Sequence, residues 1–318
     1  MTTQTVAQMN LLATESPVAG VVDEIINLDP LMEFVPFETL NGTQKRWIRE
    51  STLPTPQFYD VDEELVEGNP TFAEVTVALK QIAVDSTLPG LHVTKENVNA
   101  QRALNVNKIA KSLLEEVGGK MIYGNATSFS KEFNGLQALS PAAQTTNEGS
   151  SATGAPLNLS NLDLTIDLVR NPSSPSVIMV NRQIKRRLNQ SVSTSQISTV
   201  PIRQTTDEFG RVVQFYQDLP MRRSDRMGQV EAISAGTFSA ETGGATSSIF
   251  ILTFGSPDSV SPGIFGIQGA GGIQYEDKGS DENKDNLRDR LKWYLAMGLG
   301  STKSIGRIDG ITDAAVQA

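Results

Sequence analysis

The chain has 318 residues, of which 38% are hydrophobic, and this content suffices for one large hydrophobic core or two smaller ones. It contains no cysteine, which excludes disulfides, thiolate zinc sites and cysteine nucleophiles and is compatible with a reducing compartment. The formal net charge of −9 is spread along the chain without a dense Lys/Arg stripe, which argues against a duplex-binding surface.

The N-terminal part predicts an arm followed by a short helix. Residues 1–20 are rich in Thr, Gln and Ser and too polar to fold alone, so we expect them to lie on another surface. They lack the basic flank and apolar stretch of a signal peptide, and no apolar run of about 18 residues predicts a membrane span. We therefore expect a protein that is made in a cytosol and stays there, without membrane contact. Apolar residues at helical spacing in 21–29 predict a short helix that Pro30 ends.

Two hairpins are predicted next. Asn41-Gly42 separates two strand-like runs and is a strong signal for a tight turn. A longer hairpin from Thr52 to Asp85 has the run 57–67 as its first arm and a turn at 68–70. Because a two-stranded ribbon is marginal in water, this one must pack on a sheet or on a neighbour.

The return strand of the longer hairpin carries an apolar stripe. Val75, Val77 and Leu79 alternate with polar residues and therefore share one face, with no obvious partner in the same chain. After Gln81 the apolar positions change phase, which predicts a bulge or the entry of the strand into a different environment.

Residues 93–118 form the clearest predicted helix. Thr94 is the candidate N-cap, and Gly118-Gly119 is expected to stop the helix. The segment 123–136, YGNATSFSKEFNGL, then crosses a polar stretch and returns to an apolar Gly-Leu pair. The apolar stripe of the helix consists of Val98, Val106, Ile109, Ala110, Leu113, Leu114 and Val117.

The second half of the chain predicts a mixture of helices and strands. Residues 140–156 have the composition of a loop, and Ser160 is expected to cap a helix that ends before Asn171-Pro172. The run 176–180, SVIMV, predicts a buried strand, and 181–190 predict a short basic helix.

Short strands and one long strand are predicted towards the C-terminus. Residues 197–260 contain several short strands, and the glycine-rich run 262–274 predicts a turn that leads into a strand. Residues 276–285 read as a solvated acidic loop. In 287–299 the apolar residues fall on odd positions, which favours a strand, although every fourth position also fits a helix.

The sequence offers little for catalysis. His92 is the only histidine, and a structural role near a helix terminus is favoured over a place in a catalytic triad. Ser128–Lys131 match the S-x-x-K pattern of acyl-enzymes, but the companion motifs are absent. We therefore expect that the protein is not an enzyme and has no catalytic residues.

Binding motifs are equally sparse. No helix is predicted after the glycines of 262–274, as a dinucleotide site requires, and the acidic run 276–285 lacks the regular alternation of a calcium loop. We expect no cofactor and no metal site. A basic cluster can meet nucleic acid, although a solvated or inter-subunit face is favoured. Its members are Arg182, Lys185, Arg186 and Arg187.

The order of these elements resembles the HK97-like major capsid proteins of tailed bacteriophages. In that family a tyrosine or apolar residue, Gly-Asp and then Phe-x-Gly-Leu follow the long spine helix. Asn125 stands where Asp is common. The matching residues are Tyr123, Gly124, Phe133, Gly135 and Leu136. Further similar segments are 34–54, 210–220, 264–279 and 288–299.

This resemblance implies an α+β fold with four parts. They are an N-arm (1–35), an E-loop hairpin region (36–85), a peripheral domain built on the spine helix (86–125 and 241–298) and an axial domain (126–240 and 299–318). An arm and a ribbon that cannot bury themselves on their own subunit can do so on neighbours. The implied inter-subunit contacts of the E-loop are Val75, Val77 and Leu79. The implied turn between the domains contains Gly118, Gly119, Gly124, Gly135 and Leu136.

The resemblance also implies a function. Capsid proteins of this family assemble as hexamers and pentamers into an icosahedral shell around double-stranded DNA, which places this chain in the virion after assembly in the host bacterial cytoplasm. The implied partners are copies of the chain itself, a portal protein, a decoration or cement protein and DNA in non-specific contact. A separate scaffolding protein is also implied, because a spine helix starting near residue 93 leaves no room for a scaffolding segment.

Two other functions stay open at this point. Encapsulins share the fold and form cellular compartments, although they begin with a different N-terminal helix pattern. A cargo enzyme inside the shell, in place of DNA, would identify one. An enzyme of unknown type is the alternative from another class, and turnover by a monomer would favour it.

Overall fold

The structure of the chain is a computed structural model. It describes residues 30–64, 67–89, 98–149, 154–170, 176–193, 202–206, 212–234, 237–239, 245–259, 261–280 and 286–317. The predictions for residues 1–29 and 281–285, and those for His92 and Thr94, lie outside the described residues.

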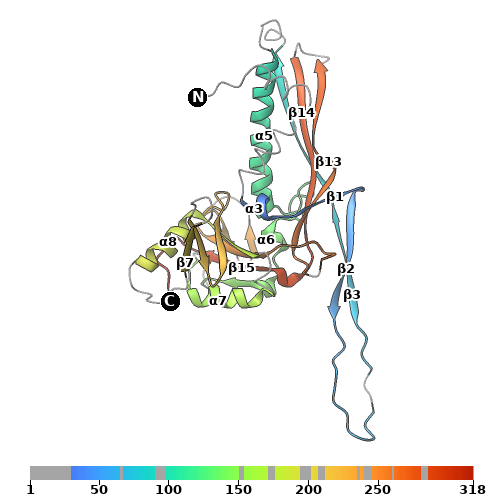
Figure 1. Ribbon diagram of the computed structural model, residues 1–318, viewed down its shortest axis with the longest axis vertical. Coiled ribbons are helices and arrows are strands. Elements are labelled where there is room, and N and C mark those ends of the chain that lie inside the picture. Colours follow the sequence, from blue (N-terminus) through green and yellow to red (C-terminus); the bar gives the residue numbers. More distant parts are fainter. Residues whose placement is uncertain are drawn as a thin grey trace.

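A four-stranded sheet and one long helix form the upper part of the molecule in Figure 1. The helix, α5 (Val98–Tyr123), lies along the sheet, and its predicted apolar stripe is buried from Val106 to Val117. β1 runs parallel to β13, whereas the β13–β14 and β14–β4 pairs are antiparallel. The strands, in sheet order, are β1 (Phe37–Leu40), β13 (Ile264–Ser280), β14 (Asn286–Leu299) and β4 (Lys80–Pro89).

β14 confirms the long strand that was predicted for residues 287–299. Leu291, Trp293, Leu295 and Met297 are all buried, and they pack in the same core as α5. Alternation with period two therefore outweighed the helical spacing, because only a strand places all of these side chains on one face.

The glycine-rich run 262–274 is part of a strand, so the prediction of a turn there is wrong. β13 continues through it, and its register with β14 shifts between Gln268 and Ile273. Gly271 and Gly272 have φ angles of 97° and 59°, which favour glycine because a Cβ atom would be strained there. The glycines thus form a bulge inside a long strand. β13 also includes 276–280, the first part of the predicted acidic loop.

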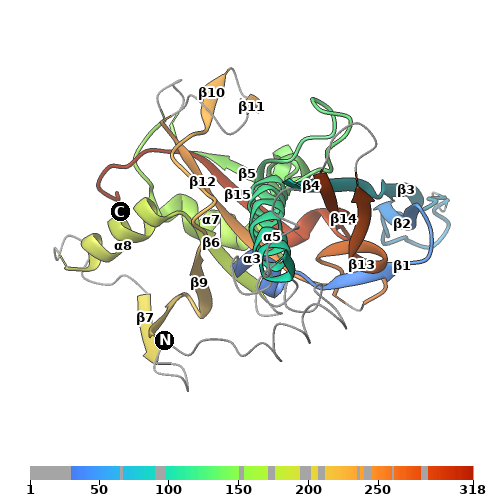
Figure 2. The ribbon, with the colours of Figure 1, turned by 90° about the horizontal axis from the view of Figure 1, so that it is seen from above.

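A seven-stranded sheet forms the second part of the molecule. In Figure 2, which looks down on α5, this sheet and the four-stranded sheet lie on opposite sides of the helix. Along β6, Ile178 and Val180 pack with α7 (Leu159–Leu168) and α8 (Arg182–Ser193), while Val177 and Met179 face the core around α5. The strands in order are β5 (Thr145–Asn147), β15 (Ile305–Ile311), β12 (Ser247–Thr253), β6 (Ser176–Val180), β9 (Leu219–Arg223), β8 (Val212–Tyr216) and β7 (Ile202–Thr206).

The strand pairing differs from two of the predicted domain boundaries. β12 pairs with β15 and β6, although residues 241–298 were assigned to the peripheral domain. Every residue of β12 is buried, as expected for a strand in the middle of a covered sheet. β4 pairs with β14, although residues 80–85 were assigned to the E-loop region.

The first predicted hairpin is wrong. The turn at Asn41-Gly42 joins β1 to β2 (Gln44–Thr52), but these strands lie in different sheets, since β1 pairs with β13 and β2 pairs antiparallel with β3 (Thr71–Ala78). The turn therefore carries the chain from one sheet to another.

The second hairpin exists with a different first arm. β3 pairs with residues 44–52, and residues 57–64 belong to a connecting loop. Pro54 and Pro56 lack the N–H groups that would extend β2. The entry of the strand into a different environment was predicted after Gln81, but it occurs at Leu79, which separates β3 of the ribbon from β4 of the four-stranded sheet.

Pro30, which was predicted to end a helix, is itself helical and is the first described residue of α3 (Pro30–Phe34). The helix predicted for 21–29 lies outside the described residues. One helix start differs from its prediction. Asn158, rather than Ser160, caps α7, and its side-chain oxygen accepts a hydrogen bond of 2.9 Å from the Ser160 N–H. The remaining short elements are α6 (Leu136–Leu139), η1 (Ala142–Gln144), β10 (Ala232–Ser234), β11 (Thr237–Ser239) and η2 (Thr302–Ser304).

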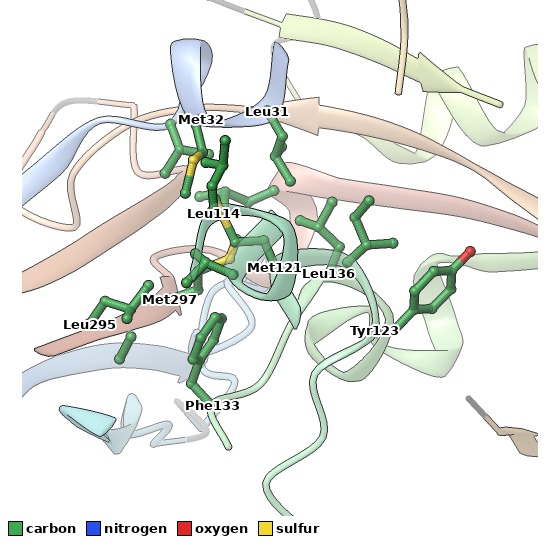
Figure 3. Packing of buried hydrophobic residues seen from close by; sticks show 14 of the residues in the cluster. Leu31, Met32, Leu114, Met121, Tyr123, Phe133, Leu136, Leu295 and Met297 are labelled. Atoms are coloured by element: carbon green, nitrogen blue, oxygen red, sulfur yellow. The ribbon is translucent and has the colours of Figure 1, made fainter. Parts of the chain in front are cut away.

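Figure 3 shows the core where α3 meets the end of α5. Leu31 and Met32 of α3 lie near Leu114 and Met121 of α5, and Leu136 lies beside Met121. α3 therefore packs on α5 through buried apolar contacts.

Candidate functional site

The ribbon formed by β2 and β3 projects away from the rest of the molecule, with its connecting loop at the far end (Figure 1). Its two faces differ because side chains alternate along each strand. Trp47 is 9% exposed on one face, whereas the next residue, Ile48, is 74% exposed on the other. We call the face of Trp47 the inner face and the face of Ile48 the outer face.

The inner face anchors the ribbon to the four-stranded sheet. The Trp47 ring packs edge-on against Phe265 of β13, with 5.3 Å between ring centroids. Arg49 donates to the backbone oxygens of Leu299 and Gly300, the latter at 3.3 Å. These contacts fix the base of the ribbon within a single chain.

The apolar stripe of β3 belongs to the same anchor. Val75, Val77 and Leu79 are partly buried and pack against the cluster of Trp47, Phe265 and Ile267. The interpretation that this stripe has no partner in its own chain is therefore wrong. Whether the three residues also contact a neighbouring subunit stays a prediction.

The outer face and the loop expose several large apolar side chains. Ile48 of β2 and Phe72 of β3 lie on the outer face, since Ile48 is paired with Glu74, two residues from Phe72 on the same side of the strand. The loop adds carboxylates between 60 and 67. Large apolar groups on a projecting element mark an interaction surface. The exposed apolar residues of the ribbon are Ile48, Leu53, Phe58, Val61 and Phe72.

The predicted crossing between domains begins five residues later than expected. α5 does not stop at Gly118-Gly119 but continues to Tyr123. Glycine in a helix costs about 1 kcal/mol relative to alanine, and burial of Met121 and Ile122 outweighs that cost.

Gly124 and Gly135 lie where two backbone segments meet at the end of α5. The Gly135 N–H donates to the Gly124 carbonyl at 2.8 Å, and the Gly124 N–H donates to the Lys120 carbonyl at 2.8 Å. A Cβ atom on Gly135 would lie 2.5 Å from the Lys120 carbonyl oxygen. Leu136 follows directly and is fully buried, so the pattern Gly-Leu reflects a close backbone approach followed by a core contact.

Asn125 organises the polar turn between these glycines. Its side-chain oxygen accepts hydrogen bonds from the N–H groups of Thr127 and Ser128, at 2.9 and 3.2 Å. Asparagine therefore supplies the same acceptor as the aspartate common in the resembled family. Ser128 and Lys131, the two ends of the S-x-x-K pattern, are both exposed on this described turn. Their side chains are not joined by a hydrogen bond there.

A buried charge network, which the sequence analysis missed, lies inside the seven-stranded sheet. Arg307 of β15 donates to Glu231 at 3.1 Å and to Ser248 at 3.1 Å, and Ser248 donates to Glu231 at 2.5 Å. Asp309, two residues along β15, is fully buried, and burial raises its pKa to about 7. The charged residues in the otherwise apolar run of β15, IGRIDGI, were the available signal.

Asp309→Asn is expected to stabilise the fold at high pH. Because the folded-state pKa lies above the unfolded value of 3.8, the native chain binds the extra proton, and stability falls as pH rises from about 4 to about 7. The asparagine side chain does not ionise, so the stability of the variant does not fall over this pH range. Its free energy of unfolding at pH 8 should therefore exceed that of the parent by roughly 2–4 kcal/mol. Denaturant unfolding at pH 8 and pH 4.5 measures the difference, and an equal difference at both pH values would contradict the assignment.

Of the other candidates, the basic cluster is the one that the structure brings together. Arg182, Lys185 and Arg186 line one cavity on α8, whereas Arg187 binds Asp313 at 2.7 Å. No cluster of potential metal ligands occurs among the residues that the structure describes. Within the same ranges, no helix has the length and apolar character needed to cross a bilayer.

The sequence matches no protein-family model and no curated protein. Solved structures, however, are similar over nearly the whole chain. The SrpI encapsulin of Synechococcus elongatus PCC 7942, in its holo complex, has a TM-score of 0.64 at 14% identity and covers 100% of this chain and 99% of its own. The capsid of cyanophage A-1(L) has a TM-score of 0.64 at 12% identity, with 89% and 93% covered.

A third similar structure is the capsid of the native GTA particle, with a TM-score of 0.60 at 11% identity and with 88% and 89% of the two chains covered. At 11 to 14% identity, the similarity of these three structures to this chain is one of fold. The chain therefore has the HK97 fold of capsid and encapsulin subunits.

Proposed function

We propose that this chain is the major capsid protein of a tailed bacteriophage, a structural protein rather than an enzyme. It assembles as hexamers and pentamers into an icosahedral shell that encloses double-stranded DNA, and its location is the virion. The observation that carries this proposal is the ribbon, whose outer face and loop expose Ile48, Phe58, Val61 and Phe72 beyond the body of the subunit.

A shell gives these side chains a partner. In a closed assembly every subunit offers the same ribbon and the same receiving surface, so one contact is repeated around each capsomer. Aromatic and aliphatic anchors surrounded by charged residues are typical of protein interfaces. The outer face has this character, because the Arg46–Glu74 pair, 3.5 Å apart, lies beside Ile48.

Other partners follow from the same proposal. We expect a portal protein at one vertex, a separate scaffolding protein during assembly in the host bacterial cytoplasm, and a decoration or cement protein on the finished shell. Contact with the packaged DNA should be non-specific, since the net charge of −9 opposes a tight duplex-binding surface.

A compartment shell of the encapsulin type is the second candidate. It is favoured by one observation, namely that the SrpI encapsulin covers 100% of this chain, compared with 89% for the cyanophage capsid.

The contents of particles isolated from the native source distinguish the two functions. A phage shell should protect double-stranded DNA from added nuclease, and particles that protect a second protein but no DNA would overturn the phage assignment.

A further inference from the structure

A cationic cavity lies beside α8, away from the ribbon. It is a shallow hollow of about 570 Å³ that is mostly open to solvent. Its lining residues are Arg182, Lys185, Arg186, Asn189, Gln190 and Arg223. All four charged groups are cations, in a chain whose net charge is −9.

The fold brings these residues together through one pair of parallel strands. β6 and β9 run parallel, with Val180 opposite Arg223, and α8 begins immediately after β6. Arg223 at the end of β9 therefore faces the first turns of α8. Asn181 caps this helix by accepting a hydrogen bond of 2.7 Å from the Ile184 N–H. Ligands of α/β sheets commonly bind at this end of parallel strands, next to a helix N-terminus.

The basic residues of α8 lie on the side of the helix opposite its buried residues. Ile184 and Leu188 are buried under α8, so Arg182, Lys185 and Arg186 fall on the opposite side at spacings of three and four. Cations in the first turns of a helix are unfavourable, because the helix dipole places partial positive charge there. Packing of the helix does not require these cations.

The positive charge of the cavity is only partly compensated. Asp313 binds both Arg186 and Arg187 at 2.7 Å, and Asp225 binds Arg223 at 3.0 Å. In the part of the chain that the structure describes, no carboxylate lies within ion-pair distance of Arg182 or Lys185. Burial, followed by the charges of Arg223 and Arg222, lowers the pKa of Lys185, which shows that its ammonium group is unfavourably placed.

The amide groups of the cavity also offer donors. The side-chain oxygen of Asn189 accepts from Gln214 at 2.8 Å, and that of Gln190 accepts from Arg187 at 3.2 Å. The NH₂ group of Asn189 can therefore donate to a further partner. A site lined by guanidinium, ammonium and amide donors is complementary to an anion with several oxygen atoms.

We propose that this cavity binds phosphate groups, and that a ligand with more than one phosphate occupies it. The volume exceeds that of a single small ion, and the cations come from both α8 and β9. Arginine pairs with phosphate through two parallel hydrogen bonds. Free oligophosphates and the phosphodiester backbone of DNA share this chemistry.

The test is calorimetric titration of the full-length chain with inorganic tripolyphosphate and, separately, with a short single-stranded oligonucleotide at fixed salt. The double variant Lys185→Gln/Arg223→Gln should lose about tenfold or more in affinity, because it removes two charge-assisted contacts. The control Lys108→Gln/Arg170→Gln removes the same charge from exposed positions and should bind like the parent.

Thermal unfolding with and without ligand distinguishes a loss of binding from a loss of folding. Tripolyphosphate should raise the melting temperature of the parent and the control but not of the double variant. Binding of tripolyphosphate alone assigns the site to free oligophosphates, and preferential binding of the oligonucleotide assigns it to the DNA backbone. Failure of both ligands to bind the parent, or equal weakening in both double variants, would overturn the proposal. The site lies within one chain, so the outcome is independent of shell assembly.

Discussion

Ile48→Asp combined with Phe72→Asp is expected to prevent shell assembly while the monomer stays folded. Both side chains are largely exposed on the outer face of the ribbon, so their replacement removes little contact inside the subunit. At an inter-subunit contact each carboxylate would be buried without a partner, at a cost of roughly 2 kcal/mol or more per site. Sedimentation velocity measures the loss of particles, and thermal unfolding of the monomer should be almost unchanged.

Two single variants on the same strand serve as controls. Thr76→Asp lies on the outer face but replaces an exposed polar residue, so its effect on assembly should be small. Val77→Asp places a carboxylate in the partly buried anchor near Trp47 and should lower the free energy of unfolding of the monomer by about 2–4 kcal/mol. Normal assembly of the Ile48/Phe72 variant would contradict the role given to the outer face.

Gly135→Ala is expected to destabilise the fold strongly, because it adds a methyl group where two backbone segments meet at the end of α5. The added Cβ would lie within 3.0 Å of three backbone atoms, of Lys120, Met121 and Gly124, and backbone atoms at the end of α5 cannot move aside cheaply. Its φ of −85° is ordinary, so the effect is steric rather than conformational. Overpacking of this kind should lower the free energy of unfolding by roughly 3 kcal/mol.

Gly42→Ala is the matched control, because nothing lies within 4 Å of a Cβ atom added there. Chemical denaturation of both variants gives the comparison. A Gly135→Ala protein as stable as Gly42→Ala would show that the two backbone segments at the end of α5 are not in close contact.

The parts of the fold that the sequence predicted well are those with a clear period. β14 and β6 follow from alternation and from a continuous apolar run, and the stripe of α5 follows from helical spacing. In each case one sheet or helix face decides the burial of every residue, so local pattern and tertiary packing agree.

The predictions that failed depended on partners distant in sequence. Asn41-Gly42 has the composition of a hairpin turn, but β1 finds β13 more than 220 residues later as its partner. The glycines before 274 have the composition of a turn, but β14 pairs with β13 on both sides of them, and they form a bulge between Gln268 and Ile273. Turn propensity describes a few neighbouring residues, and a long partner strand outweighs it.

The sequence predicted a ribbon with two different faces, but not which of these faces meets the chain's own core. Period two separated the two faces of β3 correctly, yet it could not show which face meets the chain's own core. That choice depends on Phe265 and Ile267 of β13, which lie about 190 residues beyond Val75 and cover its side of the ribbon. The exposed Ile48 and Phe72 interrupt an otherwise polar face, and this was the available signal in the sequence.

Electron microscopy of the chain, both in particles from the native source and purified at high protein concentration over a range of salt and pH, tests the central claim most directly. The account predicts closed shells of uniform diameter with icosahedral symmetry, in which ribbons lie across neighbouring subunits. A chain that remains monomeric under every condition, with its ribbon exposed, would contradict it.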